Sequence, residues 1–465
     1  MIKFLGHEIE WLPKVDKNQK ALYIQISESI EKDIKSGKLP TGFKLPPQRL
    51  IADYLKINHS TVTKAYKHCE DKGLIHGITG KGTFVSNTLG TPKTLFSSSS
   101  EHFIDMTMLH PLYETNYVLV EMVKELFPYF DTELMYKYTS ASGHQKHKFI
   151  AAKWLETLNI YCNSERMLIT SGAQNALFTI LLTEFTKGDS IAVDELTYTG
   201  LRNSANQLGL NLIPIEGDEE GMKVERLGAA IRKHNIKGIY VIPDCHNPTT
   251  VVMGINRRKS LANLIEKYKL IVIEDSVFRF ASDINIPTIH SLIPEYCYHI
   301  ASMSKLLNPG FRIAYLLIPS FSDYEKIEYV LHNQLFMPSS ITNEIVSCLQ
   351  SSKKINELLK IRVNIMNNRN DIFNKIFGTQ LCNVNVSPLY RFLDLDGYII
   401  KNIDLENFFK ERGIMIYSAD RFRVKEGIGK RGIRISIASD ESKLDFIEQL
   451  NSIYKVYNEL LSMVK

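Results

Sequence analysis

Cysteine is scarce in this sequence, and long apolar runs are missing. The six cysteines among 465 residues are widely scattered and form no Cys-x-x-Cys pair, which excludes a disulfide framework or a zinc site and indicates reduced thiols. No apolar run reaches the roughly 18 residues that a membrane span needs. The first segment, MIKFLGHEIEWLPK, has charges in its first turns and lacks the apolar stretch of a signal peptide. We therefore expect a cytoplasmic protein without a metal site or a membrane partner.

The composition is ordinary, but the charge is unevenly distributed. Hydrophobic residues make up 44% and charged residues 23% of the chain, which excludes a largely disordered protein. At about 150 residues per domain, the length predicts roughly three domains, or one large α/β unit with a smaller one. The net charge is +5, and residues 1–90 hold 14 Lys and Arg against 9 Asp and Glu. The whole excess lies in this first part, which favours a polyanion as its partner.

The first 86 residues have the pattern of three helices followed by a β-hairpin. Isoleucines recur at every fourth position over 26–34, as on the apolar face of a helix that Gly37 would end. A short helix is expected over 48–56, a longer one up to Lys72, and a hairpin over 74–85. This arrangement predicts a winged helix-turn-helix domain over 1–86. The second helix of the helix-turn-helix motif, which ends at Lys72, would enter the major groove of DNA.

The faces of that longer helix separate into an apolar and a polar set. Asn58, or His59 with Ser60, would cap the helix. Its inward stripe is formed by Val62, Ala65, Tyr66 and Cys69. The outward side chains are short donors and cations, which suit phosphates and base edges, although a solvated helix face would look the same. Together with the preceding helix and the hairpin tip, the predicted DNA contacts are Arg49, Asn58, His59, Ser60, Thr61, Thr63, Lys64, Gly80 and Lys81.

Several short motifs in this region resemble the GntR-type winged helix. They are LYIQI at 22–26, GKLPTG at 37–42, LPPQR at 45–49, TV at 61–62, AY at 65–66 and GKGTFV at 80–85. The resemblance implies that Arg49 and the first residues of the recognition helix touch double-stranded DNA. His59 stands where arginine is frequent in that family, a departure that affects the expected base preference.

Residues 87–103 have the composition of a linker, and an alternation of helix and strand follows them. The linker is polar, with Gly, Pro and four consecutive serines. The alternation predicts an α/β domain over 104–465 with a mostly parallel sheet. Its strand candidates are 167–170, 190–193, 211–215, 238–242, 270–274, 299–301 and 312–318. The pattern at the C-terminal end of this domain predicts a smaller α+β lobe with two helices. Its three short strands are expected at 389–393, 414–417 and 432–437.

A lysine in a turn of small residues is the strongest chemical signal in this second part. Ser302-Met303-Ser304-Lys305 follows a predicted strand, and Arg312 comes soon after it. A lysine in this position can form a Schiff base with an aldehyde cofactor, while hydroxyls and an arginine can hold a phosphate. A lone lysine is more often a solvated surface residue, so the assignment depends on the loops that accompany it.

Four other loops place polar residues at the ends of predicted strands. The segment 171–174, Ser-Gly-Ala-Gln, opens a helix whose N-terminal amides suit a phosphate. Asn247 could donate to a phenolic oxygen, and Tyr198 could stack on a ring. Asp275 ends an apolar strand and needs a cationic partner, such as a protonated pyridine nitrogen. Each signal also has an ordinary explanation: an αβ connection, a turn, a core tyrosine or a helix N-cap.

In this order, the loops resemble those of fold-type I pyridoxal phosphate enzymes of the aminotransferase class I and II kind. With the winged helix in front, the whole chain resembles the MocR/GabR-type regulators. The resemblance implies that Lys305 binds pyridoxal 5'-phosphate, Asp275 pairs with the ring nitrogen and Asn247 faces the ring oxygen. It gives Tyr198 a stacking role, and it gives Arg434 the role of clamping an amino-acid carboxylate. The phosphate would be held by Ala173, Gln174, Ser302, Ser304 and Arg312, with Tyr138 reaching the phosphate of the partner subunit.

The function implied is that of a homodimeric transcription regulator that binds operator DNA and senses an amine or amino acid through aldimine exchange at Lys305. Two alternatives stay open: an active class I/II aminotransferase carrying a DNA-binding domain, and a sensor of pyridoxal phosphate itself. Val277 stands where the family usually has a tyrosine, which removes one hydrogen bond to the ring oxygen and disfavours efficient transamination. Gly200 stands where some members carry a second carboxylate-binding arginine, which disfavours a dicarboxylate or ω-amino acid effector.

Overall fold

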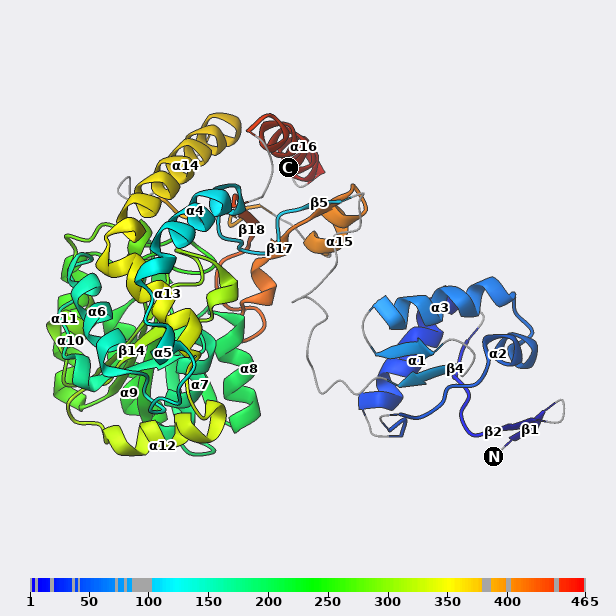
Figure 1. The fold of residues 1–465 in the computed structure, drawn as a ribbon. Helices are drawn as coiled ribbons and strands as arrows, with labels where there is room; N and C mark the ends of the chain where they lie inside the picture. Colours follow the sequence, from blue (N-terminus) through cyan, green and yellow to red (C-terminus); the bar gives the residue numbers. More distant parts are fainter. Residues whose placement is uncertain are drawn as a thin grey trace. The chain divides into compact units, whose positions relative to one another are not determined.

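The chain forms two units, Met1–Glu101 and His102–Lys465 (Figure 1). The computed structural model describes residues 2–4, 7–16, 21–35, 38–40, 42–71, 74–78, 82–85, 103–378, 386–398, 403–438 and 443–463. Within these ranges no helix combines the length and the apolar character that a membrane crossing requires. Gly37, Gly80, Lys81 and most of the predicted linker 87–103 lie outside the described residues.

The first unit contains the predicted three helices and hairpin, preceded by a second hairpin that the sequence pattern did not indicate. Its elements are β1 (Ile2–Phe4), β2 (His7–Ile9), α1 (Leu22–Lys35), α2 (Gln48–Leu55), α3 (His59–Asp71), β3 (Ile75–Ile78) and β4 (Gly82–Val85). β1 pairs with β2 and β3 with β4, both antiparallel. The winged helix-turn-helix expected from the sequence is confirmed.

The core of this unit is built from the stripes that the sequence predicted. Ile26 and Ile30 of α1 are fully buried against Val62 and Ala65 of α3. Of the alternative caps for α3, the structure uses Asn58, whose Oδ1 accepts from the Ser60 backbone N–H at 2.9 Å. An Asx side chain in this position satisfies an N–H group that the first helical turn leaves free.

The second unit is organised around a seven-stranded sheet in the order β6-β14-β13-β12-β11-β7-β8. These strands are β6 (Met167–Thr170), β7 (Ser190–Asp194), β8 (Asn211–Ile215), β11 (Ile236–Val241), β12 (Ile271–Asp275), β13 (Cys297–Ser302) and β14 (Ala314–Leu317). Only β14 runs antiparallel to its neighbours, so the mostly parallel sheet is confirmed. The last strand begins later than predicted, because Arg312 has a left-handed backbone (φ 51°) and ends the short turn Pro309–Phe311.

Helices pack on both faces of this sheet. Because successive strand residues point to opposite faces, Ile191 and Val193 pack with α7, α8 and α12, while Ala192 packs with α9 and α10 on the other face. The helices and short strands around the sheet are α4 (Asn116–Leu126), α5 (Thr132–Met135), α6 (Gln145–Glu156), α7 (Ala173–Glu184), α8 (Thr199–Leu208), β9 (Gly217–Asp218), β10 (Gly221–Met222), α9 (Val224–His234), α10 (Ile255–Tyr268), α11 (Ile289–Leu292), α12 (Tyr324–Leu335) and α13 (Ser340–Ser351).

The smaller lobe joins the end of the chain to the first residues of the second unit. Its elements are β5 (Ile104–Asp105), α14 (Lys354–Phe377), β15 (Tyr390–Asp394), α15 (Leu405–Lys410), β16 (Ile414–Met415), β17 (Tyr417–Ser418), β18 (Gly432–Ser436) and α16 (Lys443–Met463). The single strand predicted at 414–417 is two strands, since β16 pairs with β5 and β17 pairs with β18. α14 and α16 lie side by side (Figure 1) and share a core of aromatic and aliphatic side chains.

Candidate functional site

Five predicted loops lie at one edge of the large sheet. β6, β7, β11, β12 and β13 run in the same direction, so their carboxyl ends meet at this edge. The loops that follow β6, β7, β11 and β13 carry Gly172, Tyr198, Asn247 and Lys305, and Asp275 is the last residue of β12. Ligands of open α/β sheets bind in the crevice outside the carboxyl ends of the strands.

Lys305 lies in a tight turn directly after β13. The turn is closed by Ser302, whose Oγ accepts from the Ser304 backbone N–H at 3.2 Å. Lys305 Nζ donates to the backbone carbonyl of Leu109. Burial and the positive charges of Arg434 and Arg312 lower the pKa of Lys305 to about 8. A lysine that loses its proton this readily suits Schiff-base chemistry, which needs the neutral amine.

Asp275 is a buried carboxylate with one oxygen in use. Its Oδ2 accepts from the Tyr240 hydroxyl at 2.7 Å, whereas its Oδ1 is buried and has no hydrogen-bond partner among the described residues. Burial raises the pKa of Asp275 to about 6, against the opposing effect of the Tyr240 hydrogen bond. A buried carboxylate oxygen without a partner can accept a hydrogen bond from the protonated nitrogen of a pyridine ring.

Tyr198 lies close to Asp275 and is held by tight packing at the start of α8. Burial and the neighbouring Asp275 raise the pKa of Tyr198 to about 12. Gly200 is essential to this packing, because a Cβ at that position would lie 2.4 Å from Tyr198 Cε1 and 2.2 Å from Gln174 Oε1. The arginine that some family members carry at this position therefore has no room here.

The start of α7 and Arg312 form a cradle that suits a phosphate. Gly172 precedes the helix with a positive φ of 85°, and no side chain caps the free N–H groups of the first turn. Arg312 Nη2 donates to the Ser171 carbonyl at 3.1 Å, and a Cβ on Gly172 would come within 2.5 Å of that nitrogen. Helix N-terminal amides beside a guanidinium are a typical phosphate site.

The side chain of Gln174 points away from this cradle and contacts α8. Its side-chain Nε2 donates to the Gly200 carbonyl at 3.2 Å and to Ser204 Oγ at 2.9 Å. The side chain therefore braces α8, and only the backbone N–H groups of Ala173 and Gln174 stay available for a phosphate.

Arg434 is a buried cation with no carboxylate partner among the described residues. It is 4% exposed and lies among the rings of Tyr390, Tyr417 and Phe422. Its Nη1 donates to Asn247 Oδ1 at 2.9 Å and its Nη2 to the Thr107 carbonyl at 2.5 Å. Burial lowers the pKa of Arg434 to about 10.

These contacts also orient Asn247. Because its Oδ1 accepts from Arg434, its Nδ2 stays available as a donor, as a phenolic ring oxygen would require. Asp440 and Glu441, which could instead brace Arg434, lie outside the described residues.

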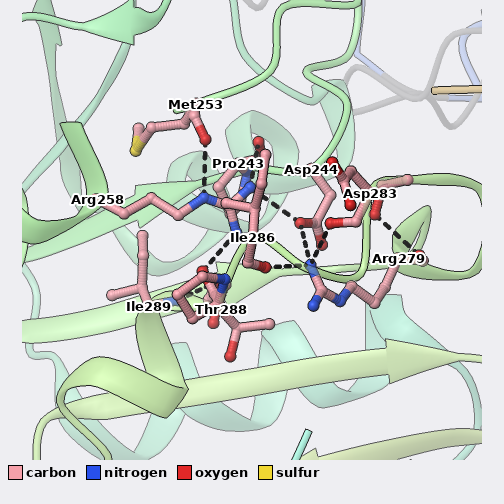
Figure 2. Close-up of polar contacts among 12 residues, drawn as sticks. Pro243, Asp244, Met253, Arg258, Arg279, Asp283, Ile286, Thr288 and Ile289 are labelled. Atoms are coloured by element: carbon pink, nitrogen blue, oxygen red, sulfur yellow. Dashed lines mark hydrogen bonds and ion pairs between the residues drawn. The ribbon is translucent and has the colours of Figure 1, made fainter. Parts of the chain in front are cut away.

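A buried charge cluster fixes the loop that carries Asn247 (Figure 2). Asp244 Oδ1 accepts from Arg258 Nη2 at 3.0 Å and from Arg279 Nη1 at 3.2 Å. Arg258 also donates to the carbonyls of Pro243 and Met253, on both sides of the loop. These arginines and Tyr240 were not among the predicted site residues, because Arg258 lies in the charged run INRRKS at 255–260 and Arg279 and Tyr240 lie among apolar residues, and neither pattern marks a buried ion pair.

Tyr138 lies on the surface of the second unit, 81% exposed, with its ring 5.7 Å from that of Phe336. A tyrosine that reaches the site of a partner subunit would be exposed in this way.

The predicted DNA-binding residues form an exposed surface of the first unit. Arg49 on α2 is exposed, as are Asn58, His59, Ser60, Thr63 and Lys64 around the start of α3, and Thr61 is half-buried. Lys64 Nζ lies 4.2 Å from the Tyr23 ring centroid, and Thr63 Oγ1 donates to Gln48 Oε1 at 2.8 Å. These contacts join α3 to α1 and α2 while they leave its N-terminal face open.

Comparison with known proteins identifies both units. Residues 101–447 match the family of class I and II aminotransferases, and residues 22–85 match the bacterial regulatory proteins of the gntR family. The HTH-type transcriptional regulator YdeF of Bacillus subtilis is 33% identical over 96% of both chains. The probable rhizopine catabolism regulatory protein MocR of Rhizobium meliloti is 24% identical over 64% of this chain and 65% of its own. The chain belongs to the MocR-type transcription regulators.

Two further similarities complete the comparison. The vitamin B6 salvage pathway transcriptional repressor PtsJ of Salmonella typhimurium is 28% identical over 62% of this chain and 66% of its own. An archaeal alanine:glyoxylate aminotransferase has the same fold, with a TM-score of 0.69, 22% identity and coverage of 77% and 91% of the two chains. Membership of the aminotransferase class I and II family supports the predicted cofactor, pyridoxal 5'-phosphate. The predicted fold, a winged helix joined to a fold-type I aminotransferase domain, is confirmed.

Proposed function

We propose that this MocR-type regulator binds pyridoxal phosphate at Lys305 and senses an amino acid or amine in the same pocket. The DNA-binding part would be residues 1–86 and the sensing part residues 104–465. The observation that carries the proposal is Arg434, a buried guanidinium whose two donors meet only an amide oxygen and a backbone carbonyl. A buried cation of this kind has a strong preference for an anionic ligand.

The residues present fit the cofactor. Asp275 Oδ1 would accept from the ring nitrogen, Asn247 Nδ2 would donate to the ring oxygen, and Tyr198 would contact the ring face. The N-terminal amides of α7 and Arg312 would bind the phosphate, with Ser302 and Ser304 in the adjacent turn. When bound, pyridoxal phosphate supplies an aldehyde that reacts with amines and a ring that withdraws electrons. Lys305, with its pKa lowered to about 8, supplies a neutral amine close to physiological pH.

Binding of an effector at Arg434 provides a route to the linker. Arg434 donates to the Thr107 carbonyl, and a carboxylate entering this position would compete for that donor. Thr107 follows Met106, whose backbone N–H donates to Met415 and whose carbonyl accepts from Ser436. The segment that begins at Ile104, directly after the predicted linker, is therefore held by β16 and by β18, the strand that carries Arg434. A ligand shifts DNA binding through this segment only as far as it favours one arrangement over the other.

The proposed regulator acts as a homodimer. Large aromatic side chains are exposed on and near α4, α5 and α6 of the second unit, around the predicted cross-subunit residue Tyr138. They are Tyr117, Phe127, Tyr129, Tyr136, Tyr138 and Phe149. An exposed apolar surface of this extent is typical of a protein–protein interface.

The test of the proposal is a titration of wild-type protein and Arg434→Lys with amino acids and with the matching amines that lack a carboxylate. The planar fork of arginine makes two parallel hydrogen bonds to a carboxylate that lysine cannot reproduce, so the variant should lose about 2–5 kcal/mol of amino-acid binding. Cofactor absorbance and DNA affinity without effector should not change. Arg391→Lys is the matched control, because Arg391 lies on the neighbouring strand and donates to Asn374. An unchanged amino-acid response in Arg434→Lys would exclude the carboxylate clamp.

An aminotransferase with a DNA-binding domain is the second candidate, and the lowered pKa of Lys305 favours it. A lysine near neutrality can carry a proton between two positions of a bound substrate. The absence of a hydroxyl at Val277 disfavours it. Cofactor absorbance after addition of an amino acid distinguishes the two, because lasting conversion to the pyridoxamine form requires transamination.

A sensor of the cofactor itself is the third candidate. The relative PtsJ is described as a vitamin B6 salvage pathway repressor, which makes DNA affinity that responds to pyridoxal phosphate alone a specific possibility for this chain. A DNA shift assay with and without cofactor, in the absence of amines, tests it.

A further inference from the structure

Tyr240 connects the middle of the large sheet to the carboxylate at its edge. It lies on β11 in register with Ile273 of β12, two residues before Asp275. Because residues two apart in a strand point to the same face, Tyr240 and Asp275 are on one face of neighbouring strands. The phenol hydroxyl donates to Asp275 Oδ2 at 2.7 Å, and both side chains are buried.

This hydrogen bond gives the two oxygens of Asp275 different surroundings. Oδ2 is occupied by Tyr240, and Oδ1 is buried without a partner among the described residues. Without the phenol, the plane of the carboxylate could turn about the terminal bond of the aspartate at little cost, since that torsion is broad. A buried tyrosine hydroxyl needs a partner, and for Tyr240 that partner is the carboxylate of Asp275.

We propose that Tyr240 is a positioning residue for Asp275: it fixes the carboxylate so that Oδ1 is the oxygen presented to the ring nitrogen of the cofactor. The inference rests on the proposed function, in which Asp275 binds that nitrogen. Tyr240 itself touches neither the cofactor nor the effector in this assignment. Its hydroxyl acts only through the carboxylate that it holds.

The surroundings of Asp275 make this contact important for its charge as well as its orientation. The groups that act on the carboxylate are the Tyr240 hydroxyl from β11, the backbone N–H of Val277 and His299 from β13, and all three favour the ionised form against the effect of burial. Tyr198 and Tyr390 are further titratable groups that interact with it. Removing the phenol hydroxyl removes the only side-chain hydrogen bond that Asp275 receives among the described residues, so its pKa rises further and more of it is protonated near neutral pH.

Tyr240→Phe in the full-length protein is the test, with Tyr298→Phe as matched control. Tyr298 is also a buried tyrosine of the same sheet, but its hydroxyl donates to Glu184 at 2.5 Å. We expect Tyr240→Phe to bind pyridoxal phosphate about tenfold or more weakly at pH 7, the effect of one lost hydrogen bond to a charged group. The pH below which cofactor affinity falls should also move upward. Tyr298→Phe should bind the cofactor as the wild type does.

A double-mutant cycle separates positioning from simple packing. In an Asp275→Asn background the carboxylate is gone, so Tyr240→Phe should cause no further loss of cofactor affinity. An equal tenfold loss in both backgrounds, or wild-type affinity and pH dependence in Tyr240→Phe, would overturn the inference. Thermal unfolding of the cofactor-free proteins identifies a variant that fails to fold, and Tyr240→Leu, which also lacks the hydroxyl and does not overfill the site, then replaces it. If the wild type itself does not bind the cofactor at Lys305, the proposed function fails, and this result is distinct from a failure of Tyr240 alone.

Discussion

Two neighbouring carboxylates at the end of β12, Glu274 and Asp275, are both buried but have opposite surroundings. Glu274 accepts from the backbone N–H groups of Ile289 at 2.8 Å and His290 at 2.9 Å, and its Oε2 lies 2.9 Å from His299 Nδ1. Burial alone would raise the pKa of Glu274, but these hydrogen bonds and the charge of His299 lower it to about 2. Asp275 has one side-chain partner, and burial raises its pKa to about 6.

The difference between Glu274 and Asp275 shows which of the two buried carboxylates can still bind a ligand. Glu274 holds the helix α11 and β13 together, and nothing remains for it to bind. Asp275, one residue later, keeps an oxygen that only a ligand can satisfy. Charge compensation separates Asp244 from Arg434: Asp244 Oδ1 accepts from two buried arginines, although its Oδ2 has no partner among the described residues, whereas Arg434 has no carboxylate partner among them. Other buried polar atoms without a partner occur away from this site, so the ligand site is indicated by the buried charged groups Asp275 and Arg434, which have no ion-pair partner among the described residues.

Replacement of Glu274 by glutamine should have the largest effect on stability. The change turns one of the two acceptor oxygens into an amide donor, so either the Ile289 N–H, or His299 together with the His290 N–H, loses its acceptor. Breaking a buried ion pair in this way costs about 3–5 kcal/mol. Because the folded pKa of Glu274 lies below its unfolded value of about 4.3, its contribution is present above that pH and is lost as the pH falls through about 2. Urea unfolding followed by Trp154 fluorescence, in a Trp11→Phe background, measures it. A loss below about 1 kcal/mol at pH 7 would show that Glu274 is not the structural member of the pair.

Asp275→Asn should act in the opposite direction on the cofactor-free protein. The folded pKa of Asp275, about 6, lies above its unfolded value of about 3.9, so its favourable contribution is present below pH 3.9 and is lost as the pH rises through 6. The neutral amide avoids the cost of a buried charge. Above pH 6 the free energy of unfolding of the variant should therefore be about 1–3 kcal/mol higher than that of the wild type.

The same variant should bind pyridoxal phosphate about tenfold to a hundredfold more weakly, since it loses a charged hydrogen bond to the ring nitrogen. Urea unfolding at pH 5 and pH 8 and cofactor titration by absorbance measure the two effects. A variant that is less stable at pH 8 and binds the cofactor normally would give Asp275 the same structural role as Glu274.

The sequence predicted the periodic features of this structure and overlooked the individual partners. All seven strands of the large sheet were predicted, because apolar runs bounded by turn residues repeat along the chain. The residues that complete the site were missed for a physical reason: Tyr240 in an apolar strand looks like any core tyrosine, and its partner is set by the register of β11 against β12. The pairing of β5 with β16, which places Thr107 beside Arg434, joins segments about 300 residues apart and has no local signal.

In contrast to the buried Arg434, Arg49 is an exposed cation. We expect Arg49→Ala to change DNA affinity less than the substitutions in the buried site change stability or cofactor affinity. Arg49 on α2 is exposed and carries its charge in water, so its contribution to DNA binding comes from contact with a phosphate and release of a counterion. The loss of one such contact should weaken binding to all sequences similarly and reduce the salt dependence, the slope of log affinity against log salt, by about 1.

Lys38→Ala is the control for Arg49→Ala, because Lys38 is also exposed but pairs with Asp33 at 2.8 Å. It removes the same charge, and screening over about 8–10 Å limits its effect on a distant phosphate. DNA shift assays at several salt concentrations, on a specific and an unrelated duplex, compare the two variants. Equal slopes for Arg49→Ala and wild type would remove Arg49 from the phosphate contacts, and a loss confined to one sequence would instead make it a base-reading residue.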